Sequence, residues 1–387
     1  MRPVGFVADN RLTLLQSGAD FFPALIAAFD AAAVEIHLET YIFANDDTGL
    51  SVKAALSRAA ARGVVVYVVT DWIGTGRAQS RALHRELLAA GVHHRSFNPW
   101  FRRGLARTHR KVCVVDRHRA FIGGLNINDD LLSDDDAHIR LPAPRWDFAV
   151  QIQGPLVNAI HLEAEAQWLR LGSLKLKARW ELFKETRHRR RSGTGAGALA
   201  AMVIRDNLRN RRTIQRATLH ALASAQKSAL LATPYFAPGR RLRDALAKAA
   251  ARGIDVTLLL GVGQFRLQDA VAHSFYPKLL KSGVKVIEYR RTQLHAKVAV
   301  VDDDWATVGS SNYDGLSLFV NQEANIVVKD ALFATNLRAH IERAVADGVA
   351  IDPEKFAHIG RAERIWYGFA YFVYRGLLRI ATLGQYS

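Results

Sequence analysis

The sequence predicts a duplicated α/β protein in which each half is a mixed, largely parallel β-sheet covered by helices. Segments with the periodicity of helices alternate with segments typical of strands, as in sheets that carry helices on their faces. The order of these segments is the same in both halves, and Ala-Ala-Ala-Arg-Gly occurs at the matching places 59–63 and 249–253. A His-x-Lys motif also occurs once in each half, at 109–111 and 295–297.

Each half is expected to contain three helices, each followed by a strand, before its motif. In the first half, a helix at 21–33 is rich in apolar residues and a strand at 34–41 alternates between apolar and polar residues. A glycine at the end of a later helix, such as Gly63, is a C-cap signal. The other expected elements, given as helix and then strand, are 50–63 and 64–69, 80–90 and 92–97, and in the second half 213–227 and 229–235, 242–253 and 254–260, and 268–281 and 284–289.

The length of 387 residues is too great for one ordinary core and suits two domains. We expect a first domain at 1–170 and a second at 200–346. Between them, 171–199 breaks the pattern and reads as a basic and glycine-rich linker. Its basic run, Arg187 to Arg191, is either a solvated loop or a contact for anionic headgroups. A C-terminal tail at 347–387 completes the chain.

The chain is strongly basic, with 53 Lys and Arg against 36 Asp and Glu and a net charge of +17. Such an excess favours a polyanionic partner, which is either a nucleic acid or an anionic membrane. Cys113 is the only cysteine, so we expect a buried core thiol and no disulfide within the chain. Residues 1–16 lack the pattern of a signal peptide or of an amino-terminal membrane span.

The two motifs extend to one shared pattern, H-x-K-x4-D-x6-G-S-x-N, except for a glycine in place of the serine in the first copy. Alternate residues of a strand share a face, so the His and Lys of each copy point the same way. A second short strand then returns to a glycine turn, where hydroxyl and amide groups offer hydrogen bonds. Imidazole, ammonium, hydroxyl and amide groups on one surface indicate a phosphate site. Its candidate residues are His109, Lys111, Asp116, Gly124 and Asn126 in the first copy and His295, Lys297, Asp302, Ser310 and Asn312 in the second.

This duplicated motif resembles the signature of the phospholipase D superfamily, and the resemblance covers roughly residues 10–345. It implies two α/β/α sandwich domains related by a pseudo-two-fold axis, with the active site at their interface. It also implies that His109 is the nucleophile that forms a phosphohistidine and that His295 is the general acid and base. The lysines and asparagines of both copies would surround the phosphate oxygens.

An acidic residue lies on a strand after each motif, Asp147 in the first half and Glu323 in the second. Taken alone, each reads as a solvated charge at a sheet edge. The resemblance implies instead that each orients the catalytic His of its own half and stabilises the imidazolium form. Asp116 and Asp302 are expected to have supporting roles, because their distance from the His along the strand argues against direct chemistry.

Further features resemble the bacterial cardiolipin synthases that lack amino-terminal transmembrane helices. These features are Gly123 to Asn128, the Gly-Ser form of the second copy, Glu39 to Phe43 with Asp46 and Gly49, and the tail. The implied reaction moves a phosphatidyl group from phosphatidylglycerol or phosphatidylethanolamine to phosphatidylglycerol. A phospholipase D or nuclease that uses water is the alternative. A third possibility is a non-catalytic basic protein that binds membrane or nucleic acid.

The same resemblance implies phospholipid substrates, an anionic membrane surface as partner, and no nucleic acid. It places the protein peripherally on the bacterial inner membrane, at the cytoplasmic face. We expect no cofactor and no metal, because each motif His is spaced from a Lys and an ammonium group is not a metal ligand. The oligomeric state stays open.

The tail from 361 to 383 is rich in aromatic and aliphatic residues but is interrupted by Arg375 and Arg379 and by two glycines. These interruptions argue against a simple membrane span. An interfacial helix, with its arginines reaching toward phosphates, fits the pattern. The alternative is a helix that docks on the protein's own core.

Overall fold

The structure, a computed structural model, describes residues 4–101, 106–133, 139–172, 197–206, 210–315 and 320–382. The basic run at Arg187 to Arg191 therefore lies outside the described residues. The first half contains the strands β1 (Val7–Gln16), β2 (Glu35–Thr40), β3 (Val65–Asp71), β4 (His93–Phe97), β6 (Val112–Val115), β7 (Arg119–Gly123) and β8 (Phe148–Gln153). Its α-helices are α1 (Ser17–Asp30), α2 (Asp47–Ala61), α3 (Arg77–Ala89) and α4 (Leu156–Leu171).

The second half follows the same plan. Its strands are β9 (Ala198–Arg205), β10 (Ser228–Thr233), β11 (Asp255–Gly261), β12 (Lys285–Tyr289), β13 (Val298–Val301), β14 (Trp305–Gly309), β15 (Glu323–Lys329) and β16 (Val349–Ala350). Its helices are α6 (Thr213–Ser224), α7 (Arg240–Ala251), α8 (Arg266–His273), α9 (Tyr276–Lys281), α11 (Ala331–Ala346), α12 (Pro353–Ala357) and α13 (Arg361–Thr382).

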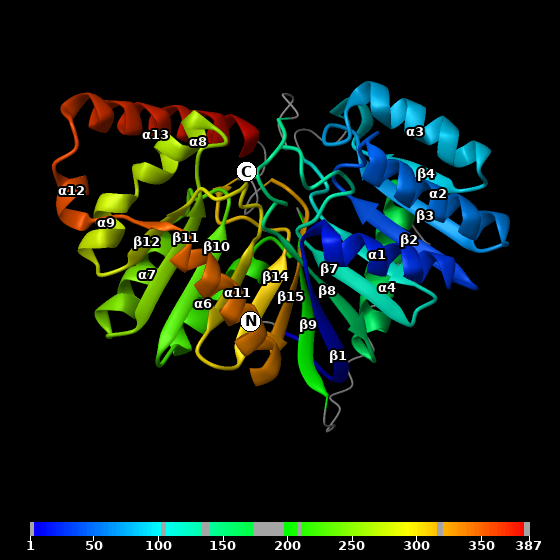
Figure 1. Cartoon of the computed structure of the whole chain (residues 1–387), viewed down its shortest axis with the longest axis horizontal. Coiled ribbons are helices and arrows are strands. Elements are labelled where there is room, and N and C mark those ends of the chain that lie inside the picture. Colours follow the sequence, from blue (N-terminus) through cyan, green and yellow to red (C-terminus); the bar gives the residue numbers. More distant parts are fainter. Residues whose placement is uncertain are drawn as a thin grey trace.

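All of these strands form one fifteen-stranded sheet with the order β16-β12-β11-β10-β13-β14-β15-β9-β1-β8-β7-β6-β2-β3-β4 (Figure 1). Apart from β16, the order on one side of the β9/β1 junction repeats on the other side. β1 joins the halves because it pairs antiparallel with both β8 and β9. The sheet therefore does not stop at the boundary between the halves.

The sheet is mixed, as expected, but the prediction that it is largely parallel was wrong. Only the strands that follow helices, β2-β3-β4 and β10-β11-β12, run parallel to one another. The motif strands β6 and β7, and likewise β13 and β14, pair antiparallel. The connection between them is too short for a crossover, and a tight turn between adjacent strands can only give an antiparallel pair.

A shared hydrophobic core lies where the halves meet. It contains side chains of the motif strands of both halves, such as Val112 and Val298, together with Ile160 of α4 and Leu337 of α11. The opposite face of each half is covered separately, by α1 to α3 in the first half and by α6 to α9 in the second. The interface that carries both motifs is thus a packed interior rather than a loose contact between two domains.

Two details of the second half differ from the expected elements. The single helix expected at 268–281 is two helices, α8 and α9, because Pro277 lies at the start of α9 and cannot continue a preceding helix. The tail forms α13, which lies along α8 (Figure 1). No helix in the described part of the chain is long and apolar enough to cross a membrane.

α13 combines both arrangements considered for the tail. On one face, Tyr367, Tyr371 and Tyr374 pack against the core of the second half, and the Tyr374 hydroxyl accepts a hydrogen bond from the Gly315 N–H at 2.7 Å. On the other face, large apolar side chains are exposed, with Phe372 75% and Ile365 71% accessible. The helix is therefore docked on the protein and still presents an apolar surface to its surroundings.

Candidate active site

The backbone of each motif is hydrogen-bonded to the other half of the protein. Thr108 and Gln322 form a parallel bridge, in which the His109 N–H donates to the Gln322 carbonyl at 2.9 Å. In the same way, Trp146 and Leu294 form a parallel bridge, and the His295 N–H donates to the Trp146 carbonyl at 3.0 Å. The His of each motif is thereby placed beside the acidic strand of the opposite half.

Each acidic residue consequently contacts the motif His of the opposite half. Nδ1 of His295 lies 2.6 Å from Oδ2 of Asp147, and Nδ1 of His109 lies 3.1 Å from Oε2 of Glu323. The expectation that each carboxylate orients the His of its own half was wrong. The reason is the pair of parallel bridges, which bring Trp146, just before Asp147, to the second motif and Gln322, just before Glu323, to the first.

These contacts fix the useful tautomer of both imidazoles. A carboxylate can only accept, so Nδ1 carries the proton and Nε2 of the neutral ring is left as a base. Both carboxylates are almost completely buried. Burial raises the pKa of Asp147, but the charge of Lys297 and the hydrogen bond from His295 hold the pKa below its usual value. Both acidic residues therefore remain ionised, and each contacts Nδ1 of one imidazole.

Burial lowers the pKa of both histidines. For His295, Lys297 adds to this effect, and the result is a lowered pKa despite the opposing effect of Asp147. For His109, Glu323 opposes burial but does not reverse the direction of the shift. Both imidazoles are therefore neutral near pH 7 before a substrate binds, which leaves each of them able to act as a nucleophile or a base.

The two lysines are buried and lie close enough to influence each other. Lys111 Nζ donates to the His109 carbonyl at 2.8 Å, and Lys297 Nζ donates to the His295 carbonyl. Burial, aided by repulsion from Lys297, lowers the pKa of Lys111 to about 7. Burial lowers the pKa of Lys297 to about 8. Two ammonium groups held in one interior favour an anion that lies between them.

The difference between Gly124 and Ser310 follows from the carboxylate that each one faces. A Cβ at Gly124 would lie 2.2 Å from Oδ1 of Asp147, so the glycine makes room for that carboxylate. Ser310 Oγ instead donates to Oε2 of Glu323 at 2.5 Å. The two positions therefore shape and support the carboxylates.

The motif aspartates hold backbone turns at the far end of their strands. Asp116 accepts hydrogen bonds from the N–H groups of Ala33, Val34 and Glu35 at 2.8 to 2.9 Å. Asp302 accepts equivalent bonds from 226–228 at 2.7 to 3.1 Å. Both residues fix the start of a parallel strand, β2 or β10, and neither carboxylate contacts a motif His.

The motif asparagines are both buried, and Asn126 lines a small cavity together with His295. Asn126 Oδ1 accepts a hydrogen bond from the Ile42 N–H at 3.3 Å, which leaves its amide hydrogens as possible donors to a substrate. Asn312 is 5% exposed. The structure thus brings the His and Lys of both motifs, Asn126 and the crossed carboxylates together, whereas Asp116 and Asp302 lie apart.

Two site residues were not among those predicted. The ring of Tyr41 lies 4.9 Å from that of His109 in an edge-to-face arrangement, and Lys111 Nζ lies 5.3 Å from the Tyr41 ring. Arg145 is 5% exposed, and its charge acts on Asp147. In the sequence, only its position two residues before Asp147 could have indicated that Arg145 belongs to the site. The fold shows that its side chain is buried.

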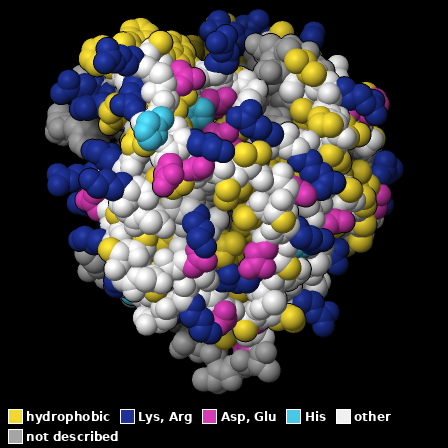
Figure 2. Space-filling model, turned by 60° about the vertical axis from the view of Figure 1, so that its left-hand side comes forward, with side chains coloured by type: hydrophobic (Ala, Val, Ile, Leu, Met, Phe, Trp, Pro, Cys, Tyr) yellow, Lys and Arg dark blue, Asp and Glu magenta, His cyan; other side chains and the backbone are white. Residues whose placement is uncertain are grey.

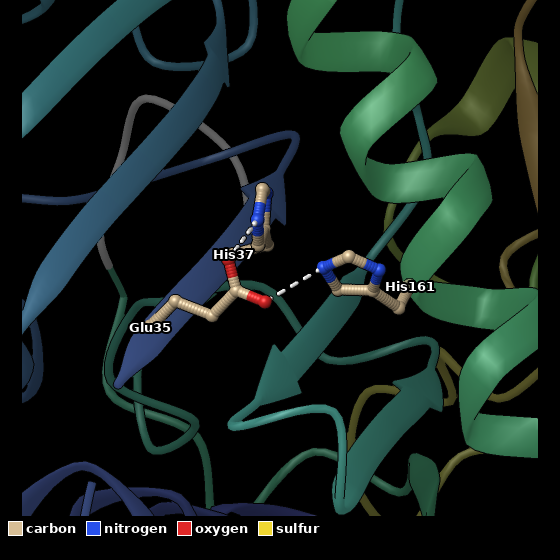
Figure 3. A group of neighbouring side chains, drawn as sticks. All are labelled: Glu35, His37 and His161. Carbon is tan, nitrogen blue, oxygen red and sulfur yellow. Dashed lines mark ion pairs between the residues drawn. The ribbon is translucent and has the colours of Figure 1, made fainter. Parts of the chain in front are cut away.

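Among the described residues, one group of His and carboxylate side chains is close enough to share a cation: Glu35, His37 and His161. Figure 3 shows both imidazoles directed at the Glu35 carboxylate, with His161 Nε2 at 2.9 Å and His37 Nε2 at 3.5 Å. Arg117 Nε also donates to this carboxylate at 2.6 Å, so a guanidinium already supplies the balancing charge. Glu35 and Tyr41 are separated by the length of β2, about 20 Å. The group therefore joins α4 to β2, away from the motif histidines.

The comparisons with known proteins identify the family. A sequence profile described as "Cardiolipin synthase, PLD-like domain" matches residues 25–141 and 218–345. The chain belongs to this phospholipase D-like cardiolipin synthase family. Both motifs fall within the matched ranges, so the resemblance drawn from them and the duplicated α/β fold are confirmed, and the chain is an enzyme of this family.

Similar proteins cover most of the chain. Cardiolipin synthase B of Escherichia coli (strain K12) is 38% identical over 344 residues, which are 87% of this chain and 81% of that protein. A probable cardiolipin synthase of Bacillus subtilis (strain 168) is 28% identical over 374 residues, 93% of this chain and 71% of that protein. The crystal structure of phosphatidylserine synthase from Haemophilus influenzae aligns with a TM-score of 0.69 over 99% of this chain and 97% of that chain, at 14% identity. This last similarity shows the shared fold.

Proposed function

We propose that this chain is a cardiolipin synthase that transfers a phosphatidyl group from phosphatidylglycerol or phosphatidylethanolamine to phosphatidylglycerol. The observation that carries the proposal is the interface at which two buried imidazoles, each backed by a carboxylate, share a site with two buried lysines. These groups suit displacement at a phosphodiester, which requires a nucleophile, a proton donor and cations for the non-bridging oxygens. The family membership supports the lipid as substrate.

In the first step, Nε2 of His109 attacks phosphorus and forms a P–N bond. The P–O bond to the headgroup breaks, and the leaving oxygen takes the proton from Nε2 of protonated His295. The headgroup alcohol, glycerol or ethanolamine, leaves. His295 acquires its proton in the complex, since the bound phosphate offsets the lysine charges that keep its pKa low, and the 2.6 Å contact to Asp147 then favours imidazolium.

In the second step, the neutral His295 accepts the proton of the terminal hydroxyl of phosphatidylglycerol. The resulting oxygen attacks phosphorus, and the P–N bond to His109 breaks, which yields cardiolipin and restores both imidazoles. Water in place of this hydroxyl would give phosphatidic acid. Asn126, Asn312 and the two lysines hold the non-bridging oxygens through both steps.

We also propose a peripheral position at the cytoplasmic face of the bacterial inner membrane, and α13 supports the contact with an anionic membrane surface. Ile365, Phe369 and Phe372 follow an i, i+4, i+7 spacing and form one exposed apolar stripe. Arg361, Arg364, Arg375 and Arg379 are exposed on the same helix. Hydrophobic side chains and Lys and Arg side chains lie together along the upper rim of the molecule (Figure 2). Apolar insertion combined with basic groups at headgroup depth is typical of interfacial helices.

The proposal is tested by mass spectrometry of the lipids formed when purified protein is incubated with phosphatidylglycerol vesicles and EDTA. Wild-type protein is expected to form cardiolipin and glycerol, and His109→Ala is expected to form neither. Cys113→Ser is a suitable control, because it alters a buried thiol in β6 that takes no part in the reaction. Phosphatidic acid without cardiolipin would identify a hydrolase, and a folded wild-type protein without either product would refute the proposal.

A further inference from the structure

A groove of about 420 Å³ opens beside the second motif, between the two halves. One side is formed by the segments that follow the parallel strands β10, β11 and β12, at their carboxyl ends. Ligands of open α/β sheets bind at these ends, because the connecting loops there leave a crevice. The residues that line the groove include Leu141, Tyr235, Gln264, Phe265, Asp269 and Gln293.

We propose that this groove binds the glycerol headgroup of phosphatidylglycerol, first as the leaving group of a donor and then as the attacking group of the acceptor. This inference rests on the proposed function and specifies where its acceptor binds. The groove lies outside the two motifs, since none of its lining residues belongs to either motif pattern.

The position of the groove agrees with the geometry of the reaction. In an in-line displacement, the leaving group lies opposite the nucleophile, on the side of the general acid. Gln293 and Leu294, which line the groove, directly precede His295 in the chain. With His109 as the nucleophile, a headgroup that leaves toward His295 enters this groove. The acceptor hydroxyl, which gives its proton to His295, must arrive from the same side.

The polar groups of the groove suit a diol. The amide nitrogen of Gln264 is buried and has no hydrogen-bond partner among the described residues. Its amide oxygen accepts a hydrogen bond from the Tyr235 hydroxyl at 3.2 Å, which fixes the orientation of the amide. The Asp269 carboxylate is held by the Gly263 N–H at 2.9 Å and retains acceptor capacity. A glycerol headgroup has neighbouring hydroxyls that can accept from Gln264 and donate to Asp269.

The apolar part of the groove favours transfer over hydrolysis. Leu141, Pro234 and Phe265 contribute apolar walls, and an occupied apolar groove excludes water from the reacting phosphorus. Phe265 directly precedes α8, the helix on which α13 packs (Figure 1). The apolar face of α13 and the groove thus lie on neighbouring elements, which gives a lipid a short route from a membrane surface to His295.

The test compares Gln264→Met with Gln268→Met in the full-length protein on phosphatidylglycerol vesicles. Gln264→Met removes the unpaired donor and nearly preserves side-chain volume, whereas Gln268 is exposed on α8 outside the groove. Cardiolipin and phosphatidic acid are both quantified, and the ratio between them is the readout. We expect Gln264→Met to lower the ratio by about three- to tenfold, the effect of one lost hydrogen bond to the acceptor. Gln268→Met is expected to match the wild type.

The outcomes separate this inference from the proposed function. An unchanged ratio in Gln264→Met, with both products formed, would overturn the groove as headgroup site and leave the synthase intact. Absence of both products from the wild type would overturn the proposed function itself. A fall in both products in equal proportion would contradict the role of the groove as acceptor site, because loss of donor binding lowers both products, whereas loss of acceptor binding lowers cardiolipin and spares hydrolysis. Circular dichroism and thermal unfolding of the variants confirm that each is folded.

Discussion

Nδ1 of His295 lies 2.6 Å from Oδ2 of Asp147, a residue 148 positions earlier in the other half of the chain. Glu323 and His109 make the reciprocal contact. Neither half therefore contains a complete His and carboxylate pair of its own. This crossing requires that the two halves be held together, as the shared hydrophobic core does.

Asp147→Asn is expected to lower kcat by about 10²- to 10⁴-fold, because an amide can donate to Nδ1 and so stabilise the wrong tautomer of His295. Asp303→Asn is a matched control, since Asp303 is an exposed carboxylate paired with Lys227 away from the site. Steady-state turnover of phosphatidylglycerol measures both. Full activity in a folded Asp147→Asn variant would show that the crossed contact has no role in the reaction.

Gly124→Ser and Ser310→Gly are expected to differ although they exchange the same two residues. A side chain at Gly124 meets the Asp147 carboxylate, so Gly124→Ser should displace this group and remove nearly all activity. Ser310→Gly loses one hydrogen bond to Glu323 and should reduce the free energy of unfolding by about 1 to 3 kcal/mol. Activity assays and thermal unfolding distinguish the two. Equal losses of activity would contradict the role assigned to Gly124.

The pH dependence of kcat/KM should reveal the two buried lysines. The pKa of Lys111 is lowered to about 7 and that of Lys297 to about 8, so the free enzyme loses positive charge as the pH rises through 7 to 8. Phosphate binding should weaken over this range, whereas ordinary lysines would remain charged up to about pH 10. On the acid side, the lowered pKa of His109 keeps the nucleophile neutral below pH 6.5. A kcat/KM that stays level between pH 7 and 9 would argue against charged lysines as the phosphate-binding groups.

Replacement of Phe369 and Phe372 by serine should weaken binding to anionic vesicles by about 100-fold or more, because each inserted aromatic side chain contributes about 1.5 to 3 kcal/mol. Both side chains are exposed, so the melting temperature should change little. Leu332→Ser is the control, since Leu332 is 82% exposed on α11 rather than on α13. Vesicle sedimentation provides the comparison. Undiminished binding of the double variant would place the membrane contact elsewhere.

The sequence predicted the parts of the site that local patterns encode. The sequence pattern grouped His109 with Lys111 and, through the repeat, His295 with Lys297, although both pairs lie just before β6 and β13 rather than within a strand. The crossing of Asp147 and Glu323 was missed, because it depends on bridges between residues about 150 to 210 positions apart, and no local periodicity reports such pairing. β1 was missed as a strand for a similar reason. Its role is to join the halves by pairing with β8 and β9.

The most direct measurement traps the covalent intermediate in His295→Ala, which retains the nucleophile but lacks both the acid of the first step and the base of the second. The variant is incubated with phosphatidyl-p-nitrophenol, whose leaving group needs no proton, quenched in alkali, which preserves phosphohistidine, and analysed by peptide mass spectrometry. The mechanism predicts a phosphatidyl adduct on the peptide that contains His109 and none in the double variant His109→Ala/His295→Ala. An adduct on His295 of the wild type, with His109 unmodified, would contradict the assignment of the nucleophile and reverse the roles of the two halves.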